Sequence, residues 1–396
     1  MEEWKSYRLG DIVRIGSGLA YKADYLGHGN ALLLGMGCVS FTEKFLKKGA
    51  RPYCGESDER FCVSPGDIVL ATRQQSDNLP ILGMPAIIPE EYRGKRLIAG
   101  SNLYIVQNES EIDNRYLYWL LKTPQYISHI SSCKTGTTVR MITKKDVESF
   151  VFKCPGKEQR KKISDLLWSI EDKIDLNNRI NHNLEEQIQE RFDSMIMSDN
   201  GLGYCQIADY VDVNPKRSLK KNEPAKCVDM SYLSTTGPFP SGWETKGYNG
   251  GMKFMNGDTI VARITPCLEN GKVAYVNFLD DGEVAFGSTE FIVLHAKEGV
   301  SPVFTYFLAR NKSFVDYATK NMNGSSGRQR VSGDTIEKYL IPVIDSDPLN
   351  EFSSYATPAM EVIRNNSFES RSLAATRDAM LPLLLSGKLS ISQMNV

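Results

Sequence analysis

The chain has 396 residues, of which 41% are hydrophobic and 24% charged, and its formal net charge is −1. This length predicts two or three domains, and the composition is that of an ordinary globular protein. No run of 18 apolar residues occurs, which argues against a membrane-spanning helix. Eight cysteines without a CxxC pair and only four histidines argue against a disulfide framework or a zinc ribbon. The opening residues, MEEWKSYRLG, lack both the basic and the apolar region of a signal peptide, so we expect a cytoplasmic protein.

The charged residues are unevenly distributed along the chain. Residues 1–155 contain 20 lysines and arginines against 17 acidic residues, whereas residues 156–200 contain 7 against 10. A protein with this balance would bind nucleic acid only through a local basic surface, not through its overall charge.

The sequence repeats itself after about 190 residues. The order of the repeated segments is kept, with Gly66–Arg73, Ser101–Val106, Tyr116–Leu120 and Gly136–Val147 returning as Gly257–Arg263, Ser288–Val293, Phe304–Leu308 and Ser325–Ile336. This period is too long for a solenoid repeat and suits a duplicated domain. In each copy, β-branched runs that follow a Gly-Asp turn predict strands, and the aromatic blocks predict amphipathic helices. The repeat therefore predicts two modules of mixed α and β structure.

Between the two copies, residues 158–198 contain neither glycine nor proline, and their apolar residues follow a heptad pattern. This pattern predicts one long helix of about 40 residues, or roughly 60 Å. Asn177 and Asn181 interrupt the apolar seam, which should lower stability and fix the register against a partner helix. The seam is formed by Ile163, Leu167, Ile170, Ile174, Leu184 and Ile188.

A second helical stretch over residues 349–385 has a poorer seam, because Ser367, Ser370 and Arg377 occupy inward positions. Met360 and Ile363 belong to this second seam, and Pro358 lies near its start. Such a helix would pack on the first long helix or on another protein. We predict an α+β chain in which two tandem α/β modules are separated by two long helices packed as an antiparallel coiled coil. The expected bounds are 1–156, 157–200, 201–346 and 347–396.

Motifs for catalysis and for cofactor binding are not found. The sequence contains no GxxxxGK[ST] phosphate-binding loop and no Asn-Pro-Pro-Tyr or Asp-Pro-Pro-Tyr tetrapeptide. Glu171-Asp172-Lys173 matches the end of a nuclease motif but falls on the heptad helix without an upstream metal-binding aspartate. We therefore assign no catalytic residue and no metal ligand.

Polar and basic loop residues do recur at equivalent places in the two copies. Arginine can bind guanine with two hydrogen bonds, and glutamine or asparagine can bind adenine in the same way. Small residues beside basic ones let the backbone approach phosphates. Each loop taken alone is more typical of a solvated surface, but their recurrence makes contact with DNA an equally good interpretation. The candidates are Arg73, Gln74, Gln75, Asn78, Lys134, Thr137, Arg140, Arg263, Thr265, Asn270, Lys272, Ser288, Arg328, Gln329 and Arg330.

Together these features resemble the specificity subunit of type I restriction–modification systems over essentially the whole length. The strings that carry the resemblance are LGDI at 9–12, the Gly-Asp turns at 66–67 and 257–258, ARITPCLENGK at 262–272 with FGSTEF at 286–291, Glu158-Gln159 and LPLLLSGKL at 381–389. In one departure, residues 347–351 lack a Glu-Gln pair, which leaves the start of the second helix open.

The resemblance implies that each module is a target recognition domain for one half of a split sequence in double-stranded DNA. The helices would hold the two domains apart, on the scale of the 34–36 Å that separates half-sites one DNA turn apart. It also implies partner-binding positions on the helices, at Ile163, Leu167, Ile170, Ile174, Leu184, Ile188, Met360 and Ile363. The partners would be methylation (M) subunits and a restriction (R) subunit, and these would bind S-adenosylmethionine, ATP and Mg. The chain itself would bind no cofactor and would not be an enzyme.

Two other functions remain open at this point. A self-sufficient DNA methyltransferase or nuclease can carry similar recognition domains, but it would need a cofactor motif. A scaffold that assembles proteins without touching DNA would lack salt-dependent binding to duplex DNA.

Overall fold

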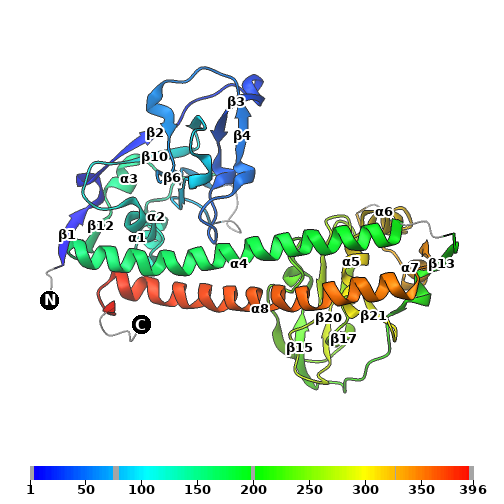
Figure 1. Ribbon diagram of the computed structural model, residues 1–396. Helices are drawn as coiled ribbons and strands as arrows, with labels where there is room; N and C mark the ends of the chain where they lie inside the picture. Colours follow the sequence, from blue (N-terminus) through cyan, green and yellow to red (C-terminus); the bar gives the residue numbers. More distant parts are fainter. Residues whose placement is uncertain (1–3, 75–79, 198–200, 326, 392–396) are drawn as a thin grey trace. The chain divides into compact units, whose positions relative to one another are not determined.

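The computed structural model describes residues 4–74, 80–197, 201–325 and 327–391. It has two compact units, Met1–Asp172 with Leu373–Val396, and Lys173–Ser372. Each unit contains one mixed α/β module and a part of two long helices, α4 (Lys157–Met197) and α8 (Ser346–Leu385) (Figure 1). The predicted class, two α/β modules with two long helices, is confirmed. The start of the second helix, which the sequence left open, lies at Ser346.

The module of the first unit is built on two four-stranded sheets. One has the order β2-β10-β6-β8 and the other the order β4-β3-β9-β5. Two short ribbons, β1 with β12 and β7 with β11, complete it. The strands are β1 (Lys5–Arg8), β2 (Val13–Ser17), β3 (Leu26–Leu34), β4 (Ala50–Tyr53), β5 (Cys62–Val63), β6 (Ile68–Ala71), β7 (Arg73–Gln74), β8 (Pro85–Ile87), β9 (Leu97–Ala99), β10 (Leu103–Asn108), β11 (Arg140–Met141) and β12 (Val151–Cys154).

Strand β6 shows why the module needs two layers around this sheet. All four of its residues are fully buried, so neither face of the strand meets solvent. Side chains alternate along a strand, and here Ile68 and Leu70 join the core with the helices while Val69 and Ala71 join the core with the second sheet. The helices are α1 (Asn114–Leu120), α2 (Pro124–Cys133) and α3 (Lys144–Glu148). Capping by Asp113, Thr123 and Thr143 fixes where they begin.

The module of the second unit repeats this plan. Its sheets have the orders β14-β21-β18-β19 and β16-β15-β20-β17, and β13 pairs with β22. The strands are β13 (Tyr204–Gln206), β14 (Val211–Val213), β15 (Pro224–Val228), β16 (Glu244–Gly247), β17 (Met252–Phe254), β18 (Thr259–Ala262), β19 (Val273–Tyr275), β20 (Ala285–Gly287), β21 (Phe291–Ala296) and β22 (Leu340–Pro342). The helices are α5 (Pro302–Arg310), α6 (Lys312–Lys320) and α7 (Gly333–Glu337).

Strand pairing corrects one of the sequence matches. The match of Ser101–Val106 with Ser288–Val293 places Leu103 opposite Glu290. In the sheets, however, Leu103 pairs with Ala71, and the residue that pairs with the equivalent Ala262 is Phe291. The match is therefore one residue off, and Glu290 is the counterpart of Asn102. A shift of one residue moves every side chain to the other face of a strand, so this correction matters for the loops below.

In the second unit, α4 and α8 run antiparallel and meet through a layer of polar side chains. Asn177 Nδ2 donates to Glu369 Oε2 at 2.7 Å and to Ser370 Oγ at 3.2 Å. Asn181 Nδ2 donates to Ser367 Oγ at 3.1 Å. The two inward serines that weaken the apolar seam are thus the partners of the two asparagines. A layer of this kind accepts one register and penalises the others, because a shift would leave amides buried without partners.

In the first unit, the same two helices meet through a buried ion pair between Arg377 and Glu171. Both side chains are less than a tenth exposed, and Arg377 also bonds to Asp378 and lies over the Trp119 ring. This ion pair explains why Arg377, the third polar residue at an inward position of the second helix, is tolerated there.

The predicted partner-binding positions are largely occupied by the chain itself. Ile163 and Leu167 are buried in the core of the first unit, and Ile188, Met360 and Ile363 in that of the second. A buried side chain has no surface left for another protein, so for these five the partner is the chain's own core. The other three, Ile170, Ile174 and Leu184, are only partly buried.

The aspartate of the second Gly-Asp turn is the centre of a buried polar cluster. The Asp258 carboxylate is fully buried and lies 3.1 Å from Arg217 Nη2 and 2.7 Å from His295 Nδ1. The backbone N–H of Met255 also donates to it, at 2.8 Å. Removal of the charge leaves a mostly buried guanidinium without its counterion.

We predict that Asp258→Asn lowers the free energy of unfolding by about 3 kcal/mol, as for other half-removed buried ion pairs. Urea unfolding measures it. The matched control is Asp67→Asn at the same turn of the first module, where Ser64 N donates at 2.7 Å. Among the described residues no basic side chain pairs with Asp67, so the control should lose about 1 kcal/mol. Equal losses in the two variants would contradict the role of the cationic partners.

A second test uses a partly buried carboxyl on α4. Glu185 accepts a hydrogen bond from the Tyr306 hydroxyl at 3.5 Å. Burial raises the pKa of Glu185 to about 7, although Arg310, His182 and Tyr306 oppose the shift. Because the folded pKa exceeds the unfolded one, the protonated carboxyl contributes stability below about pH 4.5, and this stability is lost as the pH rises to about 7.

We predict that Glu185→Gln, which mimics the protonated form, raises the free energy of unfolding at pH 8 by about 1–3 kcal/mol and changes it little at pH 4.5. Urea unfolding at the two pH values is the measurement. The same gain at both values would show that the carboxyl does not titrate as described.

Candidate nucleic-acid interface

The two loops that the sequence singled out in each module lie next to each other. In the first module, the Arg73–Gln74 strand β7 pairs with the Arg140–Met141 strand β11. In the second, Ile264 bridges to Arg330, and Thr265 N donates to Gln329 O at 3.1 Å. The backbone thus joins two segments some 65 residues apart in the sequence into one surface. In each module the first of these two loops leaves from the end of the fully buried strand, β6 or β18, and the second follows a helix, α2 or α6.

A glycine makes the loop between α2 and β11 of the first module possible. Gly136 has a φ of +91°, and a Cβ there would lie 2.2 Å from Val139 O. Only glycine accepts this backbone without strain. The turn lets Thr135 and Met141 exchange backbone hydrogen bonds at 3.0 and 2.9 Å, which closes the loop.

In the first module, the predicted residues differ in how accessible they are. Arg73, Lys134 and Thr137 are exposed, and Arg140 is partly exposed with its Nη1 donating to Gly136 O at 2.6 Å. Gln74 is only 8% exposed, and its Oε1 accepts from Leu82 N at 3.3 Å. Base contact by Gln74 stays a prediction, and it would require this hydrogen bond to be exchanged. The predictions for Gln75 and Asn78 lie outside the described residues.

In the second module, Asn270 and Arg328 are exposed, whereas Arg263, Thr265, Lys272, Ser288, Gln329 and Arg330 are partly buried. Lys272 Nζ donates to the backbone carbonyl of Met230 at 2.9 Å. Ser288 Oγ accepts from the backbone N–H of Glu290 at 3.1 Å. Lys272 and Ser288 therefore hold their own module together, and their predicted contact with DNA would require these bonds to be exchanged.

Glu290 is the residue of this surface that sequence reasoning missed. Its carboxylate bonds to Arg330 through three hydrogen bonds of 2.7–3.0 Å and lies 3.4 Å from Arg263 Nε. The hydrogen bonds from Arg330 lower the pKa of Glu290, against the opposing effect of burial. The strand register could have identified Glu290, because the pairing of Ala262 with Phe291 places Glu290 beside Arg263. The backbone confirms it, because Arg263 N donates to Glu290 O at 3.0 Å.

The chemistry available on these surfaces is hydrogen bonding and charge. Guanidinium, ammonium and amide groups are donors of the kinds that contact phosphates and base edges. Within the described residues, no group of three or more His, Cys, Asp or Glu side chains is placed to hold a metal ion. None of the described helices is both long and apolar enough to cross a membrane.

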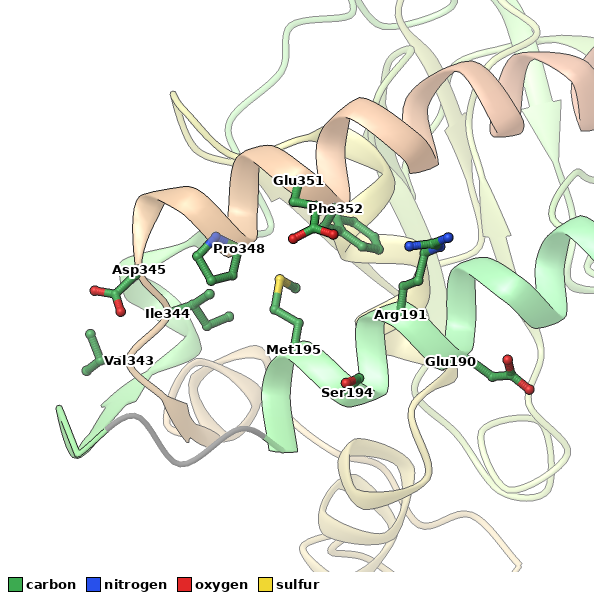
Figure 2. A pocket seen from close by; sticks show the side chains of 10 residues that line it. All are labelled: Glu190, Arg191, Ser194, Met195, Val343, Ile344, Asp345, Pro348, Glu351 and Phe352. Atoms are coloured by element: carbon green, nitrogen blue, oxygen red, sulfur yellow. The ribbon is translucent and has the colours of Figure 1, made fainter.

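A cleft of about 410 Å³ in the second unit lies elsewhere, between the end of α4 and the start of α8 (Figure 2). Figure 2 shows Met195 and Phe352 on facing helices, with Pro348 beside them. Glu190, Asp345 and Glu351 line it together with Arg191. Three carboxylates against one guanidinium would repel phosphates, so the cleft does not belong to a nucleic-acid interface.

Comparisons with known proteins agree with this architecture. The family model for the type I restriction modification DNA specificity domain matches residues 1–186. The specificity subunit of the type I restriction enzyme HindI from Haemophilus influenzae is 21% identical over an alignment that covers 98% of this chain and all of that protein. The specificity subunit of EcoAI from Escherichia coli is 30% identical over 152 residues, which are 36% of this chain and 25% of that subunit.

The fold has a counterpart among solved structures. A type I restriction–modification S subunit from M. genitalium superimposes with a TM-score of 0.64 at 12% identity, covering 97% of this chain and 96% of that one. At this identity the likeness concerns the fold. The family model matches residues 1–186, and one specificity subunit aligns over nearly the whole length, so this chain is similar to the specificity subunits of type I restriction–modification systems.

Proposed function

We propose that the chain is the DNA sequence-recognition subunit of a type I restriction–modification complex, and that each module reads one half of a bipartite target in double-stranded DNA. The observation that carries this proposal is the paired-loop surface, which occurs once in each module at the same place in the fold. The scaffold strands are alike, whereas the loop side chains differ. Because the two modules share a scaffold but carry different loop side chains, they suit two different half-sites better than two copies of one half-site.

The partners follow from the same proposal. Methylation subunits would dock on the outer faces of α4 and α8, and a restriction subunit would join the assembly. The acidic balance of residues 156–200 supports contact with protein rather than DNA over this stretch. S-adenosylmethionine, ATP and Mg would be bound by the partner subunits, and the methylation subunits would take the target base out of the duplex.

Affinity and sequence choice would come from different residues. Exposed cations such as Lys134 and Arg328 suit phosphate contacts, which position the protein without reading sequence. Groups held in place by the module, rather than free to move, suit base contacts, because less side-chain entropy is lost on binding.

Exchange of the first module tests the division of labour. We predict that replacing residues 1–155 by those of another family member changes one half of the methylated sequence and leaves the other half as it was. The measurement is a map of methylated positions in cells that express the hybrid with its partner subunits. A change in both halves would contradict the two-module proposal.

The purified chain without partners is the control for this experiment. It should bind duplex DNA with an affinity that falls steeply with salt, and it should transfer no methyl group. Methylation by the chain alone would identify a self-sufficient methyltransferase, and salt-independent or absent DNA binding would identify a scaffold.

Shortening of the helices tests their role as a spacer. Removal of seven residues from the middle of α4 and of the opposite seven from α8 keeps the heptad seam and shortens each helix by about 10 Å. We predict that the half-sites stay the same and that their separation falls by about three base pairs, at 3.4 Å each. Mapping of the methylated sequence is again the measurement. Unchanged separation in a complex that still methylates would show that the helices do not set the distance.

A further inference from the structure

In the second module, the Glu290 carboxylate holds two arginines in unequal ways. Arg330 Nε lies 3.0 Å from Oε1 and 2.9 Å from Oε2, and Arg330 Nη2 lies 2.7 Å from Oε1. The remaining nitrogen, Nη1, donates to the backbone carbonyl of Arg328 at 3.1 Å. All three nitrogens of this guanidinium are therefore engaged inside the protein.

Arg263 is held much more lightly. Only its Nε approaches the carboxylate, at 3.4 Å from Oε2. Its Nη1 and Nη2 make no hydrogen bond or ion pair with any residue that the structure describes, and the side chain is 33% exposed. Its backbone is fixed on both sides, because Arg263 N donates to Glu290 O and Val331 N donates to Arg263 O, both at 3.0 Å.

Two parallel N–H donors at the end of an arginine whose backbone is fixed match the O6 and N7 acceptors of guanine in the major groove. A phosphate would accept the same donors, but a neighbouring carboxylate makes the site a poor one for a phosphate group. Glu290 is 24% exposed and keeps its charge beside Arg263. The combination favours a base edge over the DNA backbone.

We propose that Arg263 reads a guanine in the second half-site, and that Glu290, held by Arg330, is a positioning residue that determines this choice. The inference rests on the proposed function and deepens it. Arg330, which the sequence placed among the DNA contacts, acts here through Glu290 rather than by touching a base.

The first module has no such arrangement. The counterparts of Arg263, Glu290 and Arg330 are Thr72, Asn102 and Met141, as the matching backbone bonds show. Thr72 N donates to Asn102 O at 3.0 Å, as Arg263 N does to Glu290 O. The three positions are therefore uncharged in the first module and charged in the second. Changes at Glu290 should affect only the half of the target that the second module reads.

The test uses the complete complex with its methylation subunits and compares Arg263→Lys, Glu290→Gln and Arg330→Met, the last introducing the residue of the first module. The readout is the base preference at every position of both half-sites. Arg263→Lys keeps the charge but loses the bidentate fork, and we expect one guanine of the second half-site to lose about 5- to 150-fold of its preference. Glu290→Gln and Arg330→Met should relax the same position by a smaller factor.

The first half-site is the internal control, because its unchanged reading shows a folded and assembled complex. Asn102→Asp is the matched control variant in the first module, and it should leave the second half-site unchanged. The proposal would be overturned if Arg263→Lys or Arg263→Ala weakened binding to all sequences alike with a salt slope lower by about one, which indicates a phosphate contact. It would also be overturned if Glu290→Gln left every base preference intact. A different result would contradict the proposed function itself: the complex with the unaltered chain would select no bipartite sequence.

Discussion

The central strand of each module, β6 or β18, is buried on both faces, and the position of the loops depends on it. A strand packed between helices on one side and a second sheet on the other cannot shift by one residue, because every side chain would then enter the wrong core. The loop that leaves the end of this strand is therefore held at a fixed position in its module. Backbone bonds such as Ile142 N to Thr72 O and Val331 N to Arg263 O then tie the second loop to the first without using any side chain. The frame leaves the loop side chains free to differ.

In the long helices, by contrast, polar side chains rather than backbone groups fix the structure. In the second unit, Asn177 and Asn181 are buried against serines and against backbone carbonyls, and Asn177 Oδ1 has no hydrogen-bond partner among the described residues. Apolar side chains of similar size would give a more stable pair of helices. The asparagines instead make one register better than its neighbours by leaving amides unsatisfied in the others. For a subunit that is proposed to hold two reading surfaces at a set distance, a unique register is worth this loss of stability.

Much of the fold could be predicted from the sequence, because its signals are local and periodic. The heptads of α4 and the Gly-Asp turns before β6 and β18 each depend on a few neighbouring residues. The surface was harder to predict, because it depends on pairing between distant segments. Gln74 is buried and accepts a hydrogen bond from Leu82, and no sequence pattern within the loop predicts this burial. Glu290 was missed for two reasons: the repeats drift enough to hide a one-residue slip, and a carboxylate is not among the residue types that read bases.

Glu290 illustrates how one frame can serve two chemistries. An arginine on a free loop pays for binding with side-chain entropy and contacts any phosphate within reach. A carboxylate beside it changes both properties, because it restricts the guanidinium and makes the DNA backbone a poorer partner than a base edge. The first module, with Thr72, Asn102 and Met141 at these places, has no charge to restrain and leaves its exposed cation, Arg73, one residue further along the loop. The two modules therefore differ less in how much charge they carry than in whether that charge is fixed, and fixation of charge is what separates sequence reading from general affinity.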